Sequence, residues 1–112
     1  MPEPGARPAT LRMSRTGDGY HDAHFSVHGK NVGYASVGVP LSRQVHVAVF
    51  AIRGRMQGVG YGRLFYSALE AEIRNRWKPK SIFLEAPPES VKFWRKLGFA
   101  NRKGHMWKTQ EY

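Results

Sequence analysis

The stretch that most constrains the fold is residues 45–72, where an apolar run leads through a basic, glycine-rich segment into an amphipathic pattern. The run Gln44–Ile52 is almost uninterrupted in its apolar character, which is typical of a strand covered on both faces in a mixed or parallel sheet. The glycine-rich segment follows at residues 57–62, and a helix pattern begins at residue 59 or 60. A helix N-terminus after such a loop offers free backbone N–H groups, so this stretch can hold phosphate.

The predicted helix continues to about Arg76. Its apolar positions recur at helical spacing and are Leu64, Phe65, Ala68, Leu69, Ala71 and Ile73. Before it we expect an edge strand at 10–15, a turn at 16–22, and a hairpin of strands 23–28 and 31–39 around Gly29-Lys30, with a break at 40–43. After it we expect a buried strand at 81–86, a helix from Pro87-Pro88 to about Leu97, and two short strands within 99–112.

This order of elements predicts an α+β fold built on one mixed, mostly antiparallel sheet with a strand–helix–strand–helix core. The length of 112 residues suits a single domain, which we place at residues 10–112. Residues 1–9 contain three prolines and a glycine, so we expect them to form a flexible tail.

The chain is strongly basic, with 18 Lys and Arg against 8 Asp and Glu and a formal charge of +10. Such a field favours anionic partners, namely a phosphorylated cofactor, nucleic acid or an acidic protein surface. No nucleic-acid-binding module is recognisable, so nucleic acid has weak support as a partner.

Several classes of site and location are disfavoured by composition. The chain contains no cysteine, which excludes disulfides, thiolate metal ligands and a cysteine nucleophile. The histidines do not form a HExxH pattern or a compact set, so we expect no metal site. No apolar run approaches the roughly 20 residues of a membrane span, and we expect a cytoplasmic protein without membrane contact.

The glycine-rich segment reads Q-x-x-G-x-G and is flanked by three arginines. Its residues are Gln57, Gly58, Val59, Gly60, Tyr61 and Gly62, and the arginines are Arg53, Arg55 and Arg63. Glycines let the backbone approach a pyrophosphate closely and adopt φ values that other residues avoid. Spacing alone favours a flexible turn with solvated arginines over a phosphate site, and the segment is neither the dinucleotide fingerprint nor a P-loop.

The segment resembles the acetyl-CoA loop of the GCN5-related N-acetyltransferase (GNAT) superfamily, whose motif is [RQ]-x-x-G-x-[GA] after the fourth strand. A second block, ESVKFWRKLGF at residues 89–99, is similar to the late helix of that family, and the hairpin at residues 29–35 is similar to its second and third strands. The resemblance implies acetyl-CoA as cofactor. It implies that the backbone of residues 57–62, next to Arg63, holds the pyrophosphate and that the strand end at Phe50, Ala51 and Ile52 pairs with the pantetheine arm.

The chain departs from the family in two places. Members usually carry two helices between the first and second strands, where this chain has only residues 16–22, so the acceptor cleft should be open and suited to a large acceptor. Many members also place a tyrosine at the position of Trp94 to protonate the leaving thiolate, which an indole does not do. Trp94 is therefore expected to pack against the cofactor, and the general acid is unassigned.

Two residues are candidates for the catalytic base. His46 precedes the loop on the strand face that we expect Ala48, Phe50 and Ile52 to share, and by resemblance it stands where relatives carry a general base. Glu85 closes the 81–86 strand, at a position where N-terminal-amine acetyltransferases of the family place a glutamate, and it ranks second to His46. The alternatives are a structural histidine in an apolar strand and a carboxylate that caps the next helix or pairs with an arginine.

The resulting hypothesis is an acetyl-CoA-dependent N-acetyltransferase that acts on an amine of a protein or another macromolecule. The alternative is a catalytically weak or inactive module that binds CoA, or that uses its basic surface to bind protein or nucleic acid. Exposed sheet edges also favour a homodimer.

Overall fold

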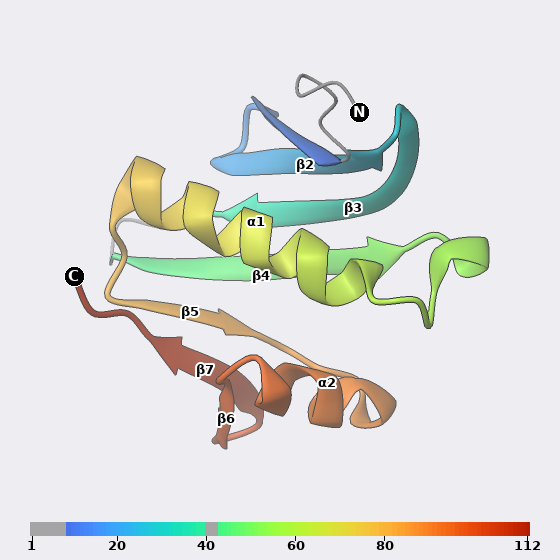
Figure 1. Ribbon diagram of the computed structural model, residues 1–112. Helices are drawn as coiled ribbons and strands as arrows, with labels where there is room; N and C mark the ends of the chain where they lie inside the picture. The colour runs from blue at the N-terminus through green and yellow to red at the C-terminus, as the bar shows by residue number, and fades with distance from the viewer. Residues whose placement is uncertain (1–8, 40–42) are drawn as a thin grey trace.

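One seven-stranded sheet forms the framework of the protein (Figure 1). The computed structural model describes residues 9–39 and 43–112. The strands lie in the order β1-β2-β3-β4-β5-β7-β6, and only β4 and β5 are parallel. They are β1 (Ala9–Arg15), β2 (Tyr20–Val27), β3 (Lys30–Gly38), β4 (Gln44–Ile52), β5 (Ser81–Leu84), β6 (Ala100–Arg102) and β7 (His105–Thr109). The prediction of an α+β fold on a mixed, mostly antiparallel sheet is confirmed.

Two α-helices pack on one face of this sheet. They are α1 (Tyr61–Trp77) and α2 (Val91–Lys96), each preceded by a short 3-10 helix, η1 (Gly54–Met56) and η2 (Pro88–Ser90). The predicted long helix is confirmed, but Leu64 is 47% exposed and does not belong to its buried side. The ring of Phe65 stacks between Phe25 of β2 and Phe50 of β4, with centroids 5.0 and 4.7 Å away. These contacts fix α1 against the centre of the sheet.

The chain passes from β1 to β2 through the short turn at residues 16–19, without a helix, as the sequence predicted. The predicted turn was too long, because β2 already begins at Tyr20 after two glycines with positive φ. The next turn consists of His28 (φ 52°) and Gly29 (φ 82°), one residue earlier than predicted, because His28 adopts the left-handed conformation. The predicted tail lies outside the described residues except for Ala9, which belongs to β1, and the predicted break lies outside them except for Arg43.

Strand β4 has the predicted bounds, but a β-bulge changes which of its side chains share a face. Ser36 pairs with Val49 and Val37 with Val47, so Ala48 is an extra residue on β4. Val47 is buried on the helix side before the bulge, and Phe50 faces the helices after it. The expectation that His46 shares a face with Ala48, Phe50 and Ile52 is therefore wrong, since the bulge moves Phe50 and Ile52 to the opposite face.

The face that carries His46, Phe83 and Trp107 is here called the open face. In the described chain both α-helices lie on the other face (Figure 1). On that face Trp94 of α2 packs against Phe50. Val49 on the open face is 43% exposed. The expectation that β4 is covered on both faces is thus wrong.

Strands β4 and β5 pair over only three residues and then separate (Figure 1). The last pair is His46 with Phe83, and β5 ends at Leu84, two residues before the predicted end. From Val47 onward β4 has no strand partner on this side among residues 9–39 and 43–112. The sheet therefore contains a split that opens toward the loop at residues 53–60.

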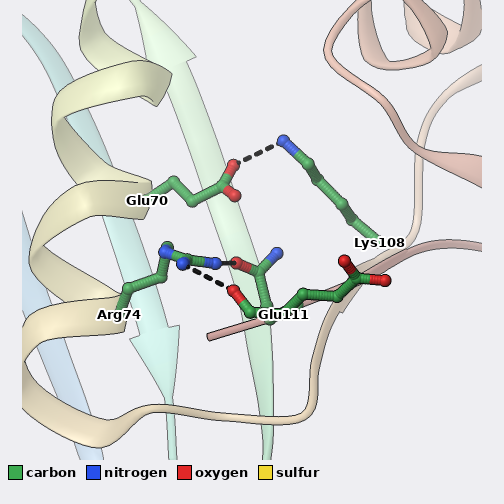
Figure 2. A network of polar contacts seen from close by, with 5 residues as sticks. Glu70, Arg74, Lys108 and Glu111 are labelled. Carbon is green, nitrogen blue, oxygen red and sulfur yellow. Dashed lines mark hydrogen bonds and ion pairs between the residues drawn. The ribbon is translucent and has the colours of Figure 1, made fainter.

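The last strand and the C-terminal residues are fastened to α1 by polar contacts (Figure 2). Arg74 donates hydrogen bonds to Gln110 Oε1 at 2.6 Å and to the carbonyl oxygen of Glu111 at 2.8 Å. Lys108 Nζ lies 2.9 Å from Glu70 Oε1. The two short C-terminal strands were predicted, and these contacts hold β7 and the residues that follow it against α1. Within residues 9–39 and 43–112, no helix has both the length and the apolar character needed to cross a membrane.

Candidate active site

The split in the sheet continues into a cleft of about 870 Å³. Its walls come from the second half of β4, the loop with the start of α1, and the segment from the end of β5 to α2. The lining residues are Val47, Ala48, Val49, Phe50, Ile52, Gln57, Gly58, Gly60, Gly62, Arg63, Leu84, Glu85, Pro87, Glu89, Ser90, Phe93 and Trp94. The volume is within the range of small-molecule and cofactor sites.

Two glycines give the loop its path. Gly58 (φ 81°) and Gly60 (φ 92°) adopt the left-handed conformation, and a Cβ atom at either position would meet no atom within 4 Å. Gly60 is also the N-cap of α1 and provides no side-chain cap, so the first backbone N–H groups of the helix are available to a ligand. Gln57 Nε2 donates a hydrogen bond to the carbonyl oxygen of Ile52 at 3.0 Å, which ties the loop to the end of β4.

The third glycine of the motif, Gly62, has a different role. A Cβ atom there would lie 3.1 Å from the Phe93 ring, so the absence of a side chain lets α2 approach α1. The sequence reasoning assigned all three glycines to the approach of a pyrophosphate. Gly62 lines the cleft and also permits close packing of the two helices behind it.

Of the predicted cofactor-binding residues, most but not all line the cleft. Phe50, Ile52, Gln57, Gly58, Gly60, Gly62, Arg63 and Trp94 do so. Ala51, Val59 and Tyr61 are not among the lining residues; Ala51 follows the bulge on the open face, and Val59 is exposed at the tip of the loop.

Trp94 forms part of an aromatic cluster at the wall of the cleft. It is 5% exposed, and its ring meets Phe50, Tyr66 and Phe99 edge-on at 5.1, 5.4 and 5.3 Å. The neighbouring Tyr66 hydroxyl is buried away from the cleft, and this burial raises the pKa of Tyr66 strongly. Neither residue supplies a proton at the cleft, which leaves the general acid unassigned among these side chains.

The two candidate bases lie on the open face, but only Glu85 lines the cleft. Glu85 directly follows β5, and its side chain is 74% exposed. His46 lies at the last β4–β5 pair, where its ring stacks on Phe83 at 4.7 Å. Burial lowers the pKa of His46, an effect that Glu85 opposes and His105 reinforces. A lowered pKa keeps the imidazole neutral at neutral pH, as a base requires.

His105 is a residue near the site to which the sequence reasoning gave no role. It begins β7, and its Nε2 atom lies 3.1 Å from Glu85 Oε2. The sequence could not reveal this contact, because the two residues are 20 positions apart and meet only through the pairing of β5 with β7.

The site suits acetyl-CoA in three respects. Free N–H groups follow Gly60 where a pyrophosphate needs donors, and Arg63 adds positive charge at the cleft. The backbone of β4 beyond His46 has no strand partner at the split and can pair with an extended amide-containing chain. Phe50 and Trp94 provide apolar walls.

Comparison with known proteins agrees with this geometry. Residues 8–107 match the family model of the acetyltransferase (GNAT) domain. The chain belongs to this family. It is an acetyltransferase domain, and acetyl-CoA is the usual cosubstrate of such domains. No curated protein sequence matches the chain.

Three solved structures illustrate the shared fold. Tetrahymena GCN5 aligns with a TM-score of 0.72 and 14% identity, over 84% of this chain and 70% of that protein. A GNAT family acetyltransferase from Elizabethkingia anophelis with acetyl-CoA bound aligns with a TM-score of 0.76 and 8% identity, over 94% and 100%. The ribosomal-protein-S18-alanine N-acetyltransferase from Escherichia coli aligns with a TM-score of 0.72 and 19% identity, over 87% and 73%. At these identities the likeness shows the fold alone.

Proposed function

We propose that this domain transfers the acetyl group of acetyl-CoA to an amine of a protein or another macromolecule. The observation that supports the proposal is the split between β4 and β5. The loop at residues 57–60, which can bind phosphate, lies at one end of the cleft, and Glu85 lies at its edge. An extended cofactor can enter from the loop, and an acceptor can reach Glu85 from the open face.

When bound, acetyl-CoA supplies a thioester-activated acetyl group. The N–H groups at the start of α1 and the arginine at position 63 would hold its phosphates, while the unpaired backbone of residues 47–52 would orient its amide-containing arm. Glu85 would take the proton that the attacking amine must lose. His46 is the second candidate for this step, since it lies on the same face at the adjacent strand.

The preference for a large acceptor rests on the uncovered sheet. β1 leads to β2 through residues 16–19, so no helix from this connection forms a wall beside the open face. A small amine would have few surfaces to enclose it there, whereas a folded protein or long chain can contact the sheet over a wide area.

A second candidate function is a weakly active or inactive CoA-binding module. The observation that favours it is Trp94, which is deeply packed where an ionisable hydroxyl is expected by resemblance. This candidate predicts cofactor binding without turnover, which distinguishes it from the first.

The test is acetyl transfer to a panel of acceptors. The panel contains peptides with a free N-terminus, N-terminally blocked lysine peptides, a basic protein mixture and the small amines spermidine and tyramine. Mass spectrometry detects the product, and a thiol reagent follows CoA release without protein background because the chain has no cysteine. We expect turnover of peptide or protein acceptors in preference to the small amines.

Variants assign the base in the same assay. Glu85→Gln should lower kcat by about 10²-fold, the lower end of the range for general-base catalysis. Glu72→Gln, on the exposed side of α1, is the control and should change kcat by less than about twofold. A larger loss in His46→Ala than in Glu85→Gln would reverse the assignment, and a wild-type protein that binds CoA but acetylates nothing would favour the inactive module.

A further inference from the structure

Among the described residues, only His105 makes a polar contact with the Glu85 carboxylate. The distance from His105 Nε2 to Glu85 Oε2 is 3.1 Å. In residues 9–39 and 43–112, no other hydrogen bond or ion pair reaches the Glu85 carboxylate. The Glu85 side chain is 74% exposed. A glutamate with this exposure samples many rotamers unless a partner restricts it.

Two features restrict the position of His105. Lys103 (φ 54°) and Gly104 (φ 87°) form a tight two-residue turn that pairs Arg102 with His105. The Phe83 ring meets the imidazole edge-on at 6.0 Å. His105 can therefore act as a fixed point against which a mobile carboxylate is oriented.

The ring of Phe83 is fixed in turn by its neighbours on the open face. It stacks between His46 and Trp107, with both centroid distances at 4.7 Å. Arg102, paired with His105 across the turn, lies over the Trp107 ring at 5.9 Å rather than on Glu85. The titratable groups that act on one another here are Glu85, His46 from β4 and His105 from β7. Glu89 lines the same cleft as Glu85.

We propose that His105 is a positioning residue that holds the Glu85 carboxylate at the mouth of the cleft, in the orientation needed to accept the proton of the acceptor amine. The inference rests on the proposed function, because it assigns Glu85 the role of base. The contact acts on geometry: it reduces the rotamers of Glu85 and so raises the fraction of encounters in which a carboxylate oxygen faces the amine.

The test measures kcat and KM for acetyl-CoA, with the acceptor of highest turnover in the panel, for His105→Leu and His105→Gln. The leucine removes the donor, and kcat should fall about three- to tenfold with KM for acetyl-CoA unchanged. The glutamine retains an N–H donor and should restore kcat to within about twofold of the wild type. Glu72→Gln, on the exposed side of α1 and away from the open face, is the control and should leave both constants unchanged.

A double variant shows whether His105 acts through Glu85. In the Glu85→Gln background, His105→Leu should lower kcat by less than about twofold, because there is no carboxylate left to orient. Multiplicative losses, or a glutamine variant as slow as the leucine variant, would overturn the inference while leaving the proposed function intact. Absence of turnover by the wild type would instead overturn the proposed function, and the role of His105 with it.

Discussion

At the scale of single residues, the position of α1 depends on the absence of a side chain at Gly33 in β3. A Cβ atom at this position would lie 2.8 Å from Cδ2 of Phe65 and 3.1 Å from Cδ1 of Ile52. Phe65 is fully buried and stacked between two other rings, so it has no free direction in which to move. Gly33 thereby sets how closely the start of α1 approaches the sheet, and with it the position of the loop.

We therefore predict that Gly33→Ala lowers the free energy of unfolding by about 1–3 kcal/mol, the usual cost of inserting a methyl group into a packed core. Gly54→Ala is the control, because a Cβ atom there meets nothing within 4 Å, and its effect should stay within about 0.5 kcal/mol. Urea denaturation measures both. Equal stabilities of the two variants would contradict the prediction and would show that the Phe65 ring can move to accommodate the added methyl group.

The glycine motif could be recognised in the sequence, but the separate roles of its three glycines could not be predicted. The positive φ values of Gly58 and Gly60 are what a loop before a helix requires, so they agree with the pattern. The contact of Gly62 with Phe93 depends on where α2 packs. Such a packing role is invisible in a local motif, because it is decided by residues about 30 positions away.

At the scale of elements, the bulge at Ala48 decides which face each residue of β4 presents. The run VHVAVFAI is apolar except for His46, so its pattern contains no alternation from which a shift of face could be detected. The bounds of the strand were predictable from that run. The sequence did not predict that the side chains of His46 and Phe50 lie on opposite faces of the sheet.

The attachment of the C-terminal residues to α1 is a second feature at this scale (Figure 2). Arg74 reaches two oxygens of the C-terminal segment and also lies 4.4 Å from the centroid of the Tyr112 ring. Because β7 begins with His105, this attachment helps to hold the strand that carries the proposed positioning residue.

Arg74→Met should lower the free energy of unfolding by about 1–2 kcal/mol, because it removes two hydrogen bonds from a charged donor and leaves a buried amide oxygen unpaired. Arg76→Met is the matched control on the same helix. Its guanidinium pairs with Glu72 four residues earlier, at an exposed site worth about 0.3–0.5 kcal/mol. Thermal or urea denaturation compares them, and equal losses would mean that the attachment contributes nothing beyond a surface pair.

At the scale of the whole molecule, the described part of the chain has its α-helices on one face of the sheet and none on the other (Figure 1). The order of strands and helices could be predicted, because periodicity, glycines and prolines mark these elements locally. The split between β4 and β5 could not be predicted from spacing alone, since it depends on the pairing of β5 with β7 and on the direction that the chain takes after Leu84. The resemblance of residues 57–62 and 89–99 to two GNAT motifs supplied the prediction of a cofactor site, which local patterns alone did not give.

Glu85 illustrates the same limit at the site. Its position at the end of a strand was apparent from the sequence. Its exposure, its place at the cleft and its contact with His105 depend instead on how β4, β5 and β7 are arranged. His46 was equally apparent, but the paired part of β4 keeps it out of the lining of the cleft. The sequence placed His46 first and Glu85 second, and we propose the reverse order because only Glu85 lines the cleft.

The central claim is that acetyl-CoA binds in the split with its phosphates at the start of α1, and the most direct test is the thermal shift caused by this ligand. At 1 mM acetyl-CoA the wild type should melt several degrees higher, up to about 10 °C if the ligand exceeds its Kd about 100-fold. Gly60→Ala, strained at φ 92° in the loop, should show a much smaller shift. Gly17→Ala, strained at φ 110° in the distant β1–β2 turn, should keep the full one. No shift of the wild type at millimolar acetyl-CoA, or equal shifts in the two variants, would contradict the claim.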